Sequence, residues 1–455
     1  MKRVLFISYT FPPVGGAGVQ RIAKFAKYLP ACQWAVSVLT AANPSVPLFD
    51  ETLCTDIPVD TVIQRATTWE PSYRLKSTIV RSERSKLHPS LGSRTKSFAR
   101  TLANLLLQPD PQILWAPSAI STGKQLLSRL PHDVIVASGP PFSAFLIGAR
   151  LSRRFNIPLV LDYRDEWDIS RTHWENRSCK GFVEGTQTWL QARTLRAANQ
   201  VIATTKLSAL QLATRVAQAG ATARVEHVYN GYDPDDFPPL SSPRPRRRKF
   251  RITYAGTLWK LTSIEPLVTA AEYISATQPE MAKRLEFVVV GRCTGEQEVV
   301  LNRLLATHVQ LNRQSYLPHA ETVQLMRDSD MLCVLLADTH DAARVVPAKI
   351  FEYLACKRPV LAIAPPGEMC ELLKDNPIAV CHAPGDIQAI AATLAMAIQS
   401  PQRLTPSIDD WDVTMHSRLG QAQQLAAILD ETAGFGPTSH SRPDGQLRKL
   451  ASVCD

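Results

Sequence analysis

Two oppositely charged side chains, Lys349 and Glu352, stand three residues apart in the second half of the chain, just before the apolar run 360–362. A spacing of three places both side chains on one face of a helix. There the lysine could bind a phosphate, while the glutamate could accept hydrogen bonds from two sugar hydroxyls. The pair therefore fits the two ends of a nucleotide sugar. The alternative is a surface ion pair between helix neighbours.

A second candidate site lies near the N-terminus, where the apolar strand 4–9 is followed by Pro12, Pro13 and then Gly15, Gly16 and Gly18. The pattern predicts a helix over residues 19–29. A strand, a glycine-rich turn and a helix can present backbone amides and the positive helix end to an anion. The spacing is not that of a dinucleotide site, because no acidic residue closes a second strand at the expected distance. A tight turn without a ligand is the alternative.

Four stretches of sequence occur in an order that is typical of one enzyme family. They are Gly15 and Gly16 with Arg21, residues 158–167, residues 230–233, and residues 349–362. In these motifs the chain resembles family 4 of the retaining glycosyltransferases, and within it the bacterial surface-polysaccharide branch. The resemblance covers roughly residues 1–430. It implies an α/β fold of the GT-B type, with two facing Rossmann-like domains, parallel sheets and an interdomain cleft.

Length and composition agree with two domains in the cytoplasm. A chain of 455 residues exceeds the size of a typical single core, and its hydrophobic content of 45% is ordinary for a globular protein. No apolar run approaches the length of a membrane span, and residues 4–11 are too short for a secretory signal. Nine cysteines, odd in number and without a CxxC pair, favour reduced thiols.

Apolar runs that alternate with helical stretches predict two parallel sheets. The runs of the first sheet are 4–8, 36–39, 134–137, 159–162 and 201–203, and those of the second are 252–254, 287–290, 331–336 and 360–364. We expect an acceptor-binding domain over 1–238, a basic Pro/Arg linker over 239–249 and a nucleotide-sugar-binding domain over 250–405. The resemblance implies a helix over 406–432 that crosses back to the first domain. Residues 433–455 have the composition of a disordered tail.

The resemblance also assigns donor-binding residues. Family members clamp the diphosphate with amides of the glycine turn and with basic side chains of the second domain, which implies roles for Gly15, Gly16 and Lys349. Glu352 would accept hydrogen bonds from the ribose. Thr257 stands where the family often has a basic residue. Lys260 is the candidate for a second phosphate contact, or else a solvated lysine.

One position departs from the family pattern. Eight residues before Glu352 the common pattern has another glutamate, which touches the donor sugar, and this chain has Arg344. An arginine offers no hydrogen-bond acceptor, so it cannot replace that carboxylate. The identity of the hexose is therefore left open.

A charged cluster follows the buried strand 159–162, at the sheet edge where ligands bind in parallel folds. It consists of Asp162, Arg164, Asp165 and Asp168. We expect Asp165 to orient or polarise an acceptor hydroxyl and Arg164 to balance its charge. In this family the leaving phosphate is thought to aid deprotonation. The alternative is an ion pair that closes the end of the strand.

Asp233, Pro234 and Asp235 match the DxD signature of metal-dependent glycosyltransferases. They lie directly after Asn230 and Gly231, where an Asx-type turn explains them without a metal. We therefore expect no metal and no cofactor other than the donor substrate itself.

Basic residues concentrate between residues 65 and 100, interleaved with apolar ones, in a chain of net charge +10. This pattern predicts a peripheral contact with an anionic membrane, and hence a lipid-linked glycan acceptor; a solvated insertion is the alternative. No nucleic-acid-binding module accompanies the charge. Two other functions stay open: a GT-B-type nucleotide-sugar epimerase, and a non-catalytic membrane-associated module that binds nucleotide sugar.

Overall fold

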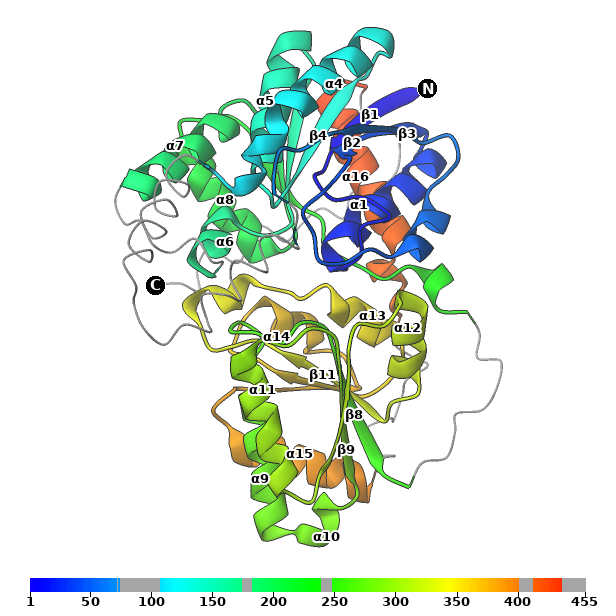
Figure 1. The fold of residues 1–455 in the computed structure, drawn as a ribbon, viewed down its shortest axis with the longest axis vertical. Coiled ribbons are helices and arrows are strands. Elements are labelled where there is room, and N and C mark those ends of the chain that lie inside the picture. The colour runs from blue at the N-terminus through cyan, green and yellow to red at the C-terminus, as the bar shows by residue number, and fades with distance from the viewer. Residues whose placement is uncertain (72, 74–106, 174–181, 239–247, 401–411, 436–455) are drawn as a thin grey trace.

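The computed structural model describes residues 1–71, 73, 107–173, 182–238, 248–400 and 412–435. In these residues the chain forms two α/β domains, one above the other in Figure 1. The first domain has a seven-stranded parallel sheet of order β3-β2-β1-β4-β5-β6-β7. The second has a six-stranded parallel sheet of order β10-β9-β8-β11-β12-β13. The expected pair of facing Rossmann-like domains is confirmed.

Strands and helices alternate along the first domain. Its strands are β1 (Lys2–Ile7), β2 (Trp34–Ala41), β3 (Val62–Ala66), β4 (Val134–Gly139), β5 (Leu159–Tyr163), β6 (Gln200–Ala203) and β7 (Arg224–His227). Its α-helices are α1 (Ala17–Tyr28), α4 (Ala116–Arg129), α5 (Ser143–Phe155), α6 (Trp167–His173), α7 (Phe182–Leu195) and α8 (Lys206–Gln218). Short 3₁₀ helices are η1 (Leu29–Cys32), η2 (Glu51–Asp56), η3 (Pro111–Trp115) and η4 (Pro234–Asp236).

The second domain repeats this alternation. Its strands are β8 (Phe250–Ala255), β9 (Leu285–Val290), β10 (Gln310–Gln314), β11 (Met331–Leu335), β12 (Val360–Ile363) and β13 (Ala379–His382). Its α-helices are α9 (Glu265–Thr277), α10 (Pro279–Ala282), α11 (Gly295–Asn302), α12 (His319–Arg327), α13 (Lys349–Ala355), α14 (Glu368–Leu373) and α15 (Ile387–Gln399). The 3₁₀ helices are η5 (Arg303–Ala306) and η6 (His340–Arg344).

All nine strands predicted from apolar runs are present, and the structure adds four that the runs did not reveal: β3, β7, β10 and β13. These four are the outer strands of the two sheets. The central strands β4, β5, β9 and β12 are buried at every position, whereas β7 and β10 contain only half-buried and exposed residues. An outer strand has a neighbour on one side only, so it lacks the continuous apolar run of a central parallel strand.

The C-terminal helix α16 (Arg418–Ala433) returns to the first domain and packs beside α1 (Figure 1). Its apolar face joins the core under β1 and β2 through Ala422, Leu425, Ala426 and Leu429. The helix begins twelve residues later than the expected residue 406, because Ser417 caps it by accepting from the Gly420 amide. At its other end Gly434 adopts φ 76° and the Phe435 amide donates to the Asp430 carbonyl at 3.0 Å.

Several expectations concern residues outside the described part. These are most of the basic segment 65–100, the linker residues 239–247, and the tail from residue 436. Seven of the nine cysteines are described, and none of these seven is in a disulfide. Among the helices of the described residues, none combines the length and the apolar character that crossing a bilayer requires.

Candidate functional site

The glycine turn joins β1 to α1 at the sheet edge that faces the second domain (Figure 1). Gly16 has φ 102°, a region that side-chain-bearing residues rarely adopt, and it directly precedes the first residue of α1. A Cβ on Gly15 would lie 2.9 Å from the Leu48 side chain, whereas a Cβ on Gly16 would meet nothing within 4 Å. The predicted strand, turn and helix are therefore present. The open space at Gly16 lies at the positive end of α1, where an anion is favoured.

Lys349 is the first residue of α13 in the second domain. Its Nζ atom lies 3.8 Å from the centre of the Tyr254 ring, and a Cβ on Gly256 would be 2.6 Å from that Nζ. Gly256, with φ 143°, follows β8, so the absence of a side chain there leaves room for the amine. Burial lowers the pKa of Lys349 to about 7. An anion beside this amine would restore its charge.

Glu352 lies one turn further along α13 and is half-buried. It accepts a hydrogen bond at 3.0 Å from Nε2 of His319, the first residue of α12. Burial alone would lower the pKa of His319, but the hydrogen bond and charge of Glu352, together with the charge of Asp236, raise it. The two predicted residues of α13 therefore have different partners: Lys349 contacts an aromatic ring, and Glu352 contacts an imidazole. They do not form the ion pair that was the alternative.

Thr257 and Lys260 lie in the loop that follows β8, and both are exposed. The Thr257 carbonyl accepts from the Tyr254 hydroxyl at 2.9 Å and from the Thr262 hydroxyl at 2.6 Å. Lys260 stands in the turn between the bridged residues Trp259 and Thr262. The contacts of this loop fix its backbone through Thr257 and leave the Lys260 side chain at the surface. A phosphate contact for Lys260 stays a prediction.

The charged cluster after β5 separates into distinct roles. Asp162 is bound by Arg21 at 2.9 Å and by the Ser138 hydroxyl at 2.8 Å, with both members of the ion pair 2% exposed. Asp168 pairs with Arg215 at 2.8 Å. Both aspartates are thus held in ion pairs, Asp162 on β5 by α1 and Asp168 on α6 by α8, and Arg164 is the partner of neither.

Arg164 and Asp165 have different surroundings from the rest of this cluster. The Arg164 guanidinium donates to the carbonyls of Gly18 and Pro140, which ties α1 to the end of β4. Burial lowers the pKa of Arg164, while the neighbouring Asp165 opposes that shift. Asp165 is exposed and makes no hydrogen bond or ion pair with any described residue. It is thus the one carboxylate of the cluster that is available to a ligand, and its catalytic role stays a prediction.

Arg344 makes a contact that the sequence did not reveal. Its Nε donates to Glu166 Oε1 at 2.8 Å and its Nη2 donates to Glu166 Oε2 at 3.0 Å, so the pair is bidentate. Glu166 follows Asp165 in the first domain, and its side chain is 4% exposed. The position at which the family has a sugar-binding glutamate therefore holds an ion pair between domains. A separation of 178 residues left no local signal for this contact.

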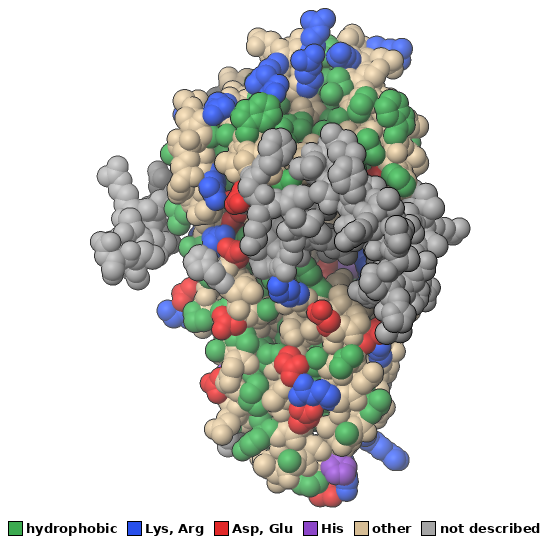
Figure 2. Space-filling model, turned by 60° about the vertical axis from the view of Figure 1, so that its left-hand side comes forward, with side chains coloured by type: hydrophobic (Ala, Val, Ile, Leu, Met, Phe, Trp, Pro, Cys, Tyr) green, Lys and Arg blue, Asp and Glu red, His purple; other side chains and the backbone are tan. Residues whose placement is uncertain are grey.

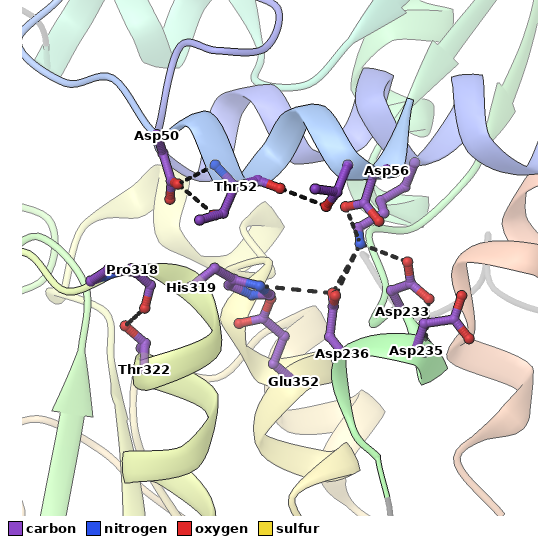
Figure 3. Close-up of polar contacts among 12 residues, drawn as sticks. Asp50, Thr52, Asp56, Asp233, Asp235, Asp236, Pro318, His319, Thr322 and Glu352 are labelled. Atoms are coloured by element: carbon purple, nitrogen blue, oxygen red, sulfur yellow. Dashed lines mark hydrogen bonds and ion pairs between the residues drawn. The ribbon is translucent and has the colours of Figure 1, made fainter. Parts of the chain in front are cut away.

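Asp233 belongs to a cluster of carboxylates around Lys24 of α1 (Figure 3). The Lys24 Nζ lies 2.6 Å from Asp233, 2.7 Å from Asp56 and 3.0 Å from Asp236. Asp233 also accepts from the Asp235 amide at 3.0 Å, so the Asx-type turn is confirmed. Asp56, Asp233 and Asp236 are close enough together to hold a metal ion, but an ammonium group occupies the space between them.

Contacts between the domains flank the glycine turn on two sides. On one side the Tyr316 hydroxyl, after β10, donates to Asp50 at 2.8 Å, and Asp50 lies beside Gly15. On the other side Arg344 binds Glu166, two residues from the Arg164 that contacts Gly18. The structure therefore brings the glycine turn, the Asp165 segment and the beginning of α13 to the same interface.

Comparisons with known proteins agree with this arrangement. The family described as glycosyl transferase 4-like domain matches residues 15–231, and the family described as glycosyl transferases group 1 matches residues 249–400. The D-inositol 3-phosphate glycosyltransferase 1 of Catenulispora acidiphila is 25% identical over 291 residues, which are 61% of this chain and 67% of that protein.

Many solved structures have a similar fold, and two serve as examples. Sucrose-phosphate synthase from Thermosynechococcus elongatus superposes with a TM-score of 0.65 at 14% identity, over 96% of this chain and all of that one. The Anabaena protein HepE in complex with UDP-glucose superposes with a TM-score of 0.57 at 17% identity, over 96% of this chain and 99% of that one. At such identities the likeness concerns the fold alone.

Proposed function

The chain belongs to the GT-B glycosyltransferases of the family 4 type, and we propose that it transfers a hexose from a nucleoside diphosphate donor, with retention of configuration, to a hydroxyl of a lipid-linked glycan in surface polysaccharide biosynthesis. The observation that carries the proposal is the half-buried Lys349, whose amine lies over the Tyr254 ring beside the glycine-lined end of β8. A lysine whose pKa is lowered to about 7 by burial gains most from an anionic ligand.

The donor diphosphate would lie between Lys349 and the amides at the beginning of α1, where Gly16 leaves the backbone open. The expected amide contact from Gly15 is not available, because that amide donates to the Leu48 carbonyl at 3.1 Å. Glu352 would accept from the ribose hydroxyls, with His319 holding the carboxylate in place at 3.0 Å. A similar fold that is solved with UDP-glucose supports a nucleotide sugar as the donor. Thr257 and Lys260 border this region from the loop after β8.

For the transfer step, Asp165 is the proposed group that orients the acceptor hydroxyl. Its carboxylate is exposed and unbound by described residues, in contrast to Asp162 and Asp168. Arg164 would hold the Asp165 segment in position through its contacts with Gly18 and Pro140 rather than touch the substrate. The proton of the acceptor would pass to the leaving phosphate, which needs no strong base from the protein.

We propose that transfer is independent of metal. The Asp233 carboxylate of the DxD-like sequence is bound by Lys24 and Lys27, at 2.6 and 2.7 Å. A cation would therefore have to displace two ammonium groups. Undiminished transfer in EDTA is the expected result, and activity that returns only after Mg²⁺ or Mn²⁺ is added would contradict it.

The proposed location is the inner face of the cytoplasmic membrane. Helices α4 and α5 carry exposed basic side chains at Lys124, Arg129, Arg150, Arg153 and Arg154, and Figure 2 shows Lys and Arg side chains gathered at the upper end of the molecule. Together with the basic segment 65–100, this charge favours an anionic leaflet. Equal sedimentation with neutral and with phosphatidylglycerol-containing vesicles would remove this part of the proposal.

The donor class is tested by thermal shift with UDP, GDP, ADP, TDP and their common sugars. A ligand that binds only the native state raises its melting temperature. We expect one base series to stabilise the wild type and not Glu352→Ala, while the matched control Glu296→Ala, an exposed carboxylate on α11, keeps the shift. Equal shifts in wild type and Glu352→Ala would refute the role of Glu352. Release of nucleotide only in the presence of an acceptor glycan would then separate transfer from epimerisation.

A further inference from the structure

Arg344 and Glu166 form a bidentate ion pair across the domain interface. Three donor–acceptor contacts hold the guanidinium: two to Glu166, at 2.8 and 3.0 Å, and one to Asp341, at 3.0 Å. The Glu166 carboxylate also accepts from the Ser208 hydroxyl at 2.6 Å. The two side chains of the pair are 16% and 4% exposed. A planar bidentate pair of this kind fixes relative orientation, because both hydrogen bonds need the two groups to be coplanar.

A second carboxylate of the second domain contacts the first domain nearby. Glu368, the first residue of α14, accepts from the backbone amides of Lys206 and Leu207 at 2.6 and 2.7 Å. These amides begin α8, where unpaired donors and the helix dipole favour a negative charge. The Tyr229 hydroxyl also donates to Glu368, and the Thr205 hydroxyl donates to the Arg344 carbonyl at 2.8 Å.

We propose that Arg344 is a positioning residue, which fastens η6 to Glu166 and thereby holds the beginning of α13 against the first domain. Arg344 is the last residue of η6, and only four residues separate it from Lys349. Glu166 is adjacent to Asp165. The ion pair thus connects the donor-binding end of α13 with the segment that carries the acceptor-orienting carboxylate. Glu368 provides the second attachment point, on α14.

This role explains why an arginine stands eight residues before Glu352. In this chain the Arg344 side chain binds the first domain, so it is not needed for recognition of the donor sugar. The inference rests on the proposed function for its kinetic consequence, but the contact itself can be measured without a substrate. Each domain has its own apolar core, so loss of the pair is expected to change domain orientation more than folding.

The test is a charge exchange. Arg344→Glu and Glu166→Arg each place like charges at the interface, and the double variant restores opposite charges. We expect each single variant to increase the radius of gyration in small-angle X-ray scattering, and to lower kcat/KM for UDP-glucose or the donor identified by thermal shift by up to about a hundredfold. The double variant should return the radius of gyration and kcat/KM most of the way to their wild-type values. Arg344→Gln, which removes the charge and the bidentate contact without adding a negative charge, replaces Arg344→Glu if the latter does not fold.

The matched control is the Arg251–Glu286 pair, which lies at 2.8 Å inside the second domain with exposures of 10% and 9%. Arg251→Gln should lower the melting temperature, leave the radius of gyration unchanged, and keep kcat/KM within about threefold for the folded protein. An unchanged radius of gyration in Arg344→Glu, or a double variant no better than the singles, would overturn the proposal. A wild type that neither binds nor consumes any donor would refute the proposed function instead, and the scattering result would still decide the role of Arg344.

Discussion

At the scale of single residues, the Lys349 amine links donor binding to pH. The amine lies over the Tyr254 ring, and burial lowers its pKa to about 7, so above neutral pH most of the free protein carries an uncharged Lys349. A donor diphosphate would favour the charged form and raise that pKa. The complex therefore holds more protons than the free protein above pH 7, and affinity must fall as pH rises there.

We predict that wild-type protein takes up close to one proton per UDP-glucose bound at pH 8, and that affinity falls by up to about tenfold per pH unit above 7. Calorimetry in two buffers of different ionisation enthalpy measures the uptake. Lys349→Arg serves as the comparison, because an arginine stays charged and should show little uptake. Equal proton uptake in both proteins would mean that another group is responsible.

Glu352 and His319 form a hydrogen-bonded pair in the candidate site. The imidazole keeps a raised pKa because the hydrogen bond and charge of Glu352, with the charge of Asp236, outweigh its burial. Glu352→Gln removes one negative charge and should lower the pKa of His319, which NMR titration can follow. The same change should weaken donor binding by about 1.5–3 kcal/mol, the range for a hydrogen bond to a charged group. A His319 titration unaffected by Glu352→Gln would show that Asp236 alone sustains the charge.

At the scale of elements, α1 is held by the three carboxylates that surround Lys24. The side chain is 2% exposed and contacts Asp56 from η2 and both Asp233 and Asp236 from the η4 segment. Lys27 binds the same cluster but is 19% exposed. A buried carboxylate cluster that loses its central cation is costly, whereas water can partly compensate at a more accessible position.

We predict that Lys24→Met lowers the free energy of unfolding by about 3–5 kcal/mol and Lys27→Met by about 1 kcal/mol, measured by urea denaturation at pH 7. In wild type, Asp233 has a pKa lowered to about 2 by Lys24, Lys27 and Tyr28 against its burial, so its contribution is present above pH 4 and lost as pH falls toward 2. Lys24→Met should weaken this trend, since Lys27 and Tyr28 still hold Asp233 while protonation relieves repulsion among the carboxylates. Equal losses for the two variants would contradict the role assigned to burial.

The elements also show what the sequence could and could not predict. Central strands such as β4 and β9 appear as continuous apolar runs, whereas β7 and β10 expose polar residues along the edge of a sheet and give no such run. The placement of Lys349 and Glu352 on one helix could be predicted, because the two residues are only three positions apart. His319 with Glu352, and Arg344 with Glu166, meet across 33 and 178 residues, and no periodic pattern encodes such contacts.

At the scale of the whole molecule, the chain passes from the first domain to the second and returns through α16. Leu425 and Leu429 of that helix are 1% and 0% exposed in the core of the first domain, and Trp34 donates to Asp430 at 3.1 Å. The core beneath β1 is therefore incomplete until the last helix has been made. Completion of the first domain thus requires residues that follow the second, so the two domains cannot be separated by a cut at residue 238.

We predict that a chain ending at residue 416 loses cooperative unfolding of the first domain. Without α16, the side chains of Phe25 and Trp34, which are buried in the complete chain, would be exposed to water. Each buried leucine that is removed contributes about 2–5 kcal/mol, so the loss of several exceeds the stability of an ordinary domain. The control ends at residue 435, which keeps the Gly434 cap and the ring contact between Phe435 and Trp34 at 6.1 Å. Scanning calorimetry should find an unchanged melting temperature for the control. A shorter chain that still unfolds in two normal transitions would contradict the contribution of α16 to the core of the first domain.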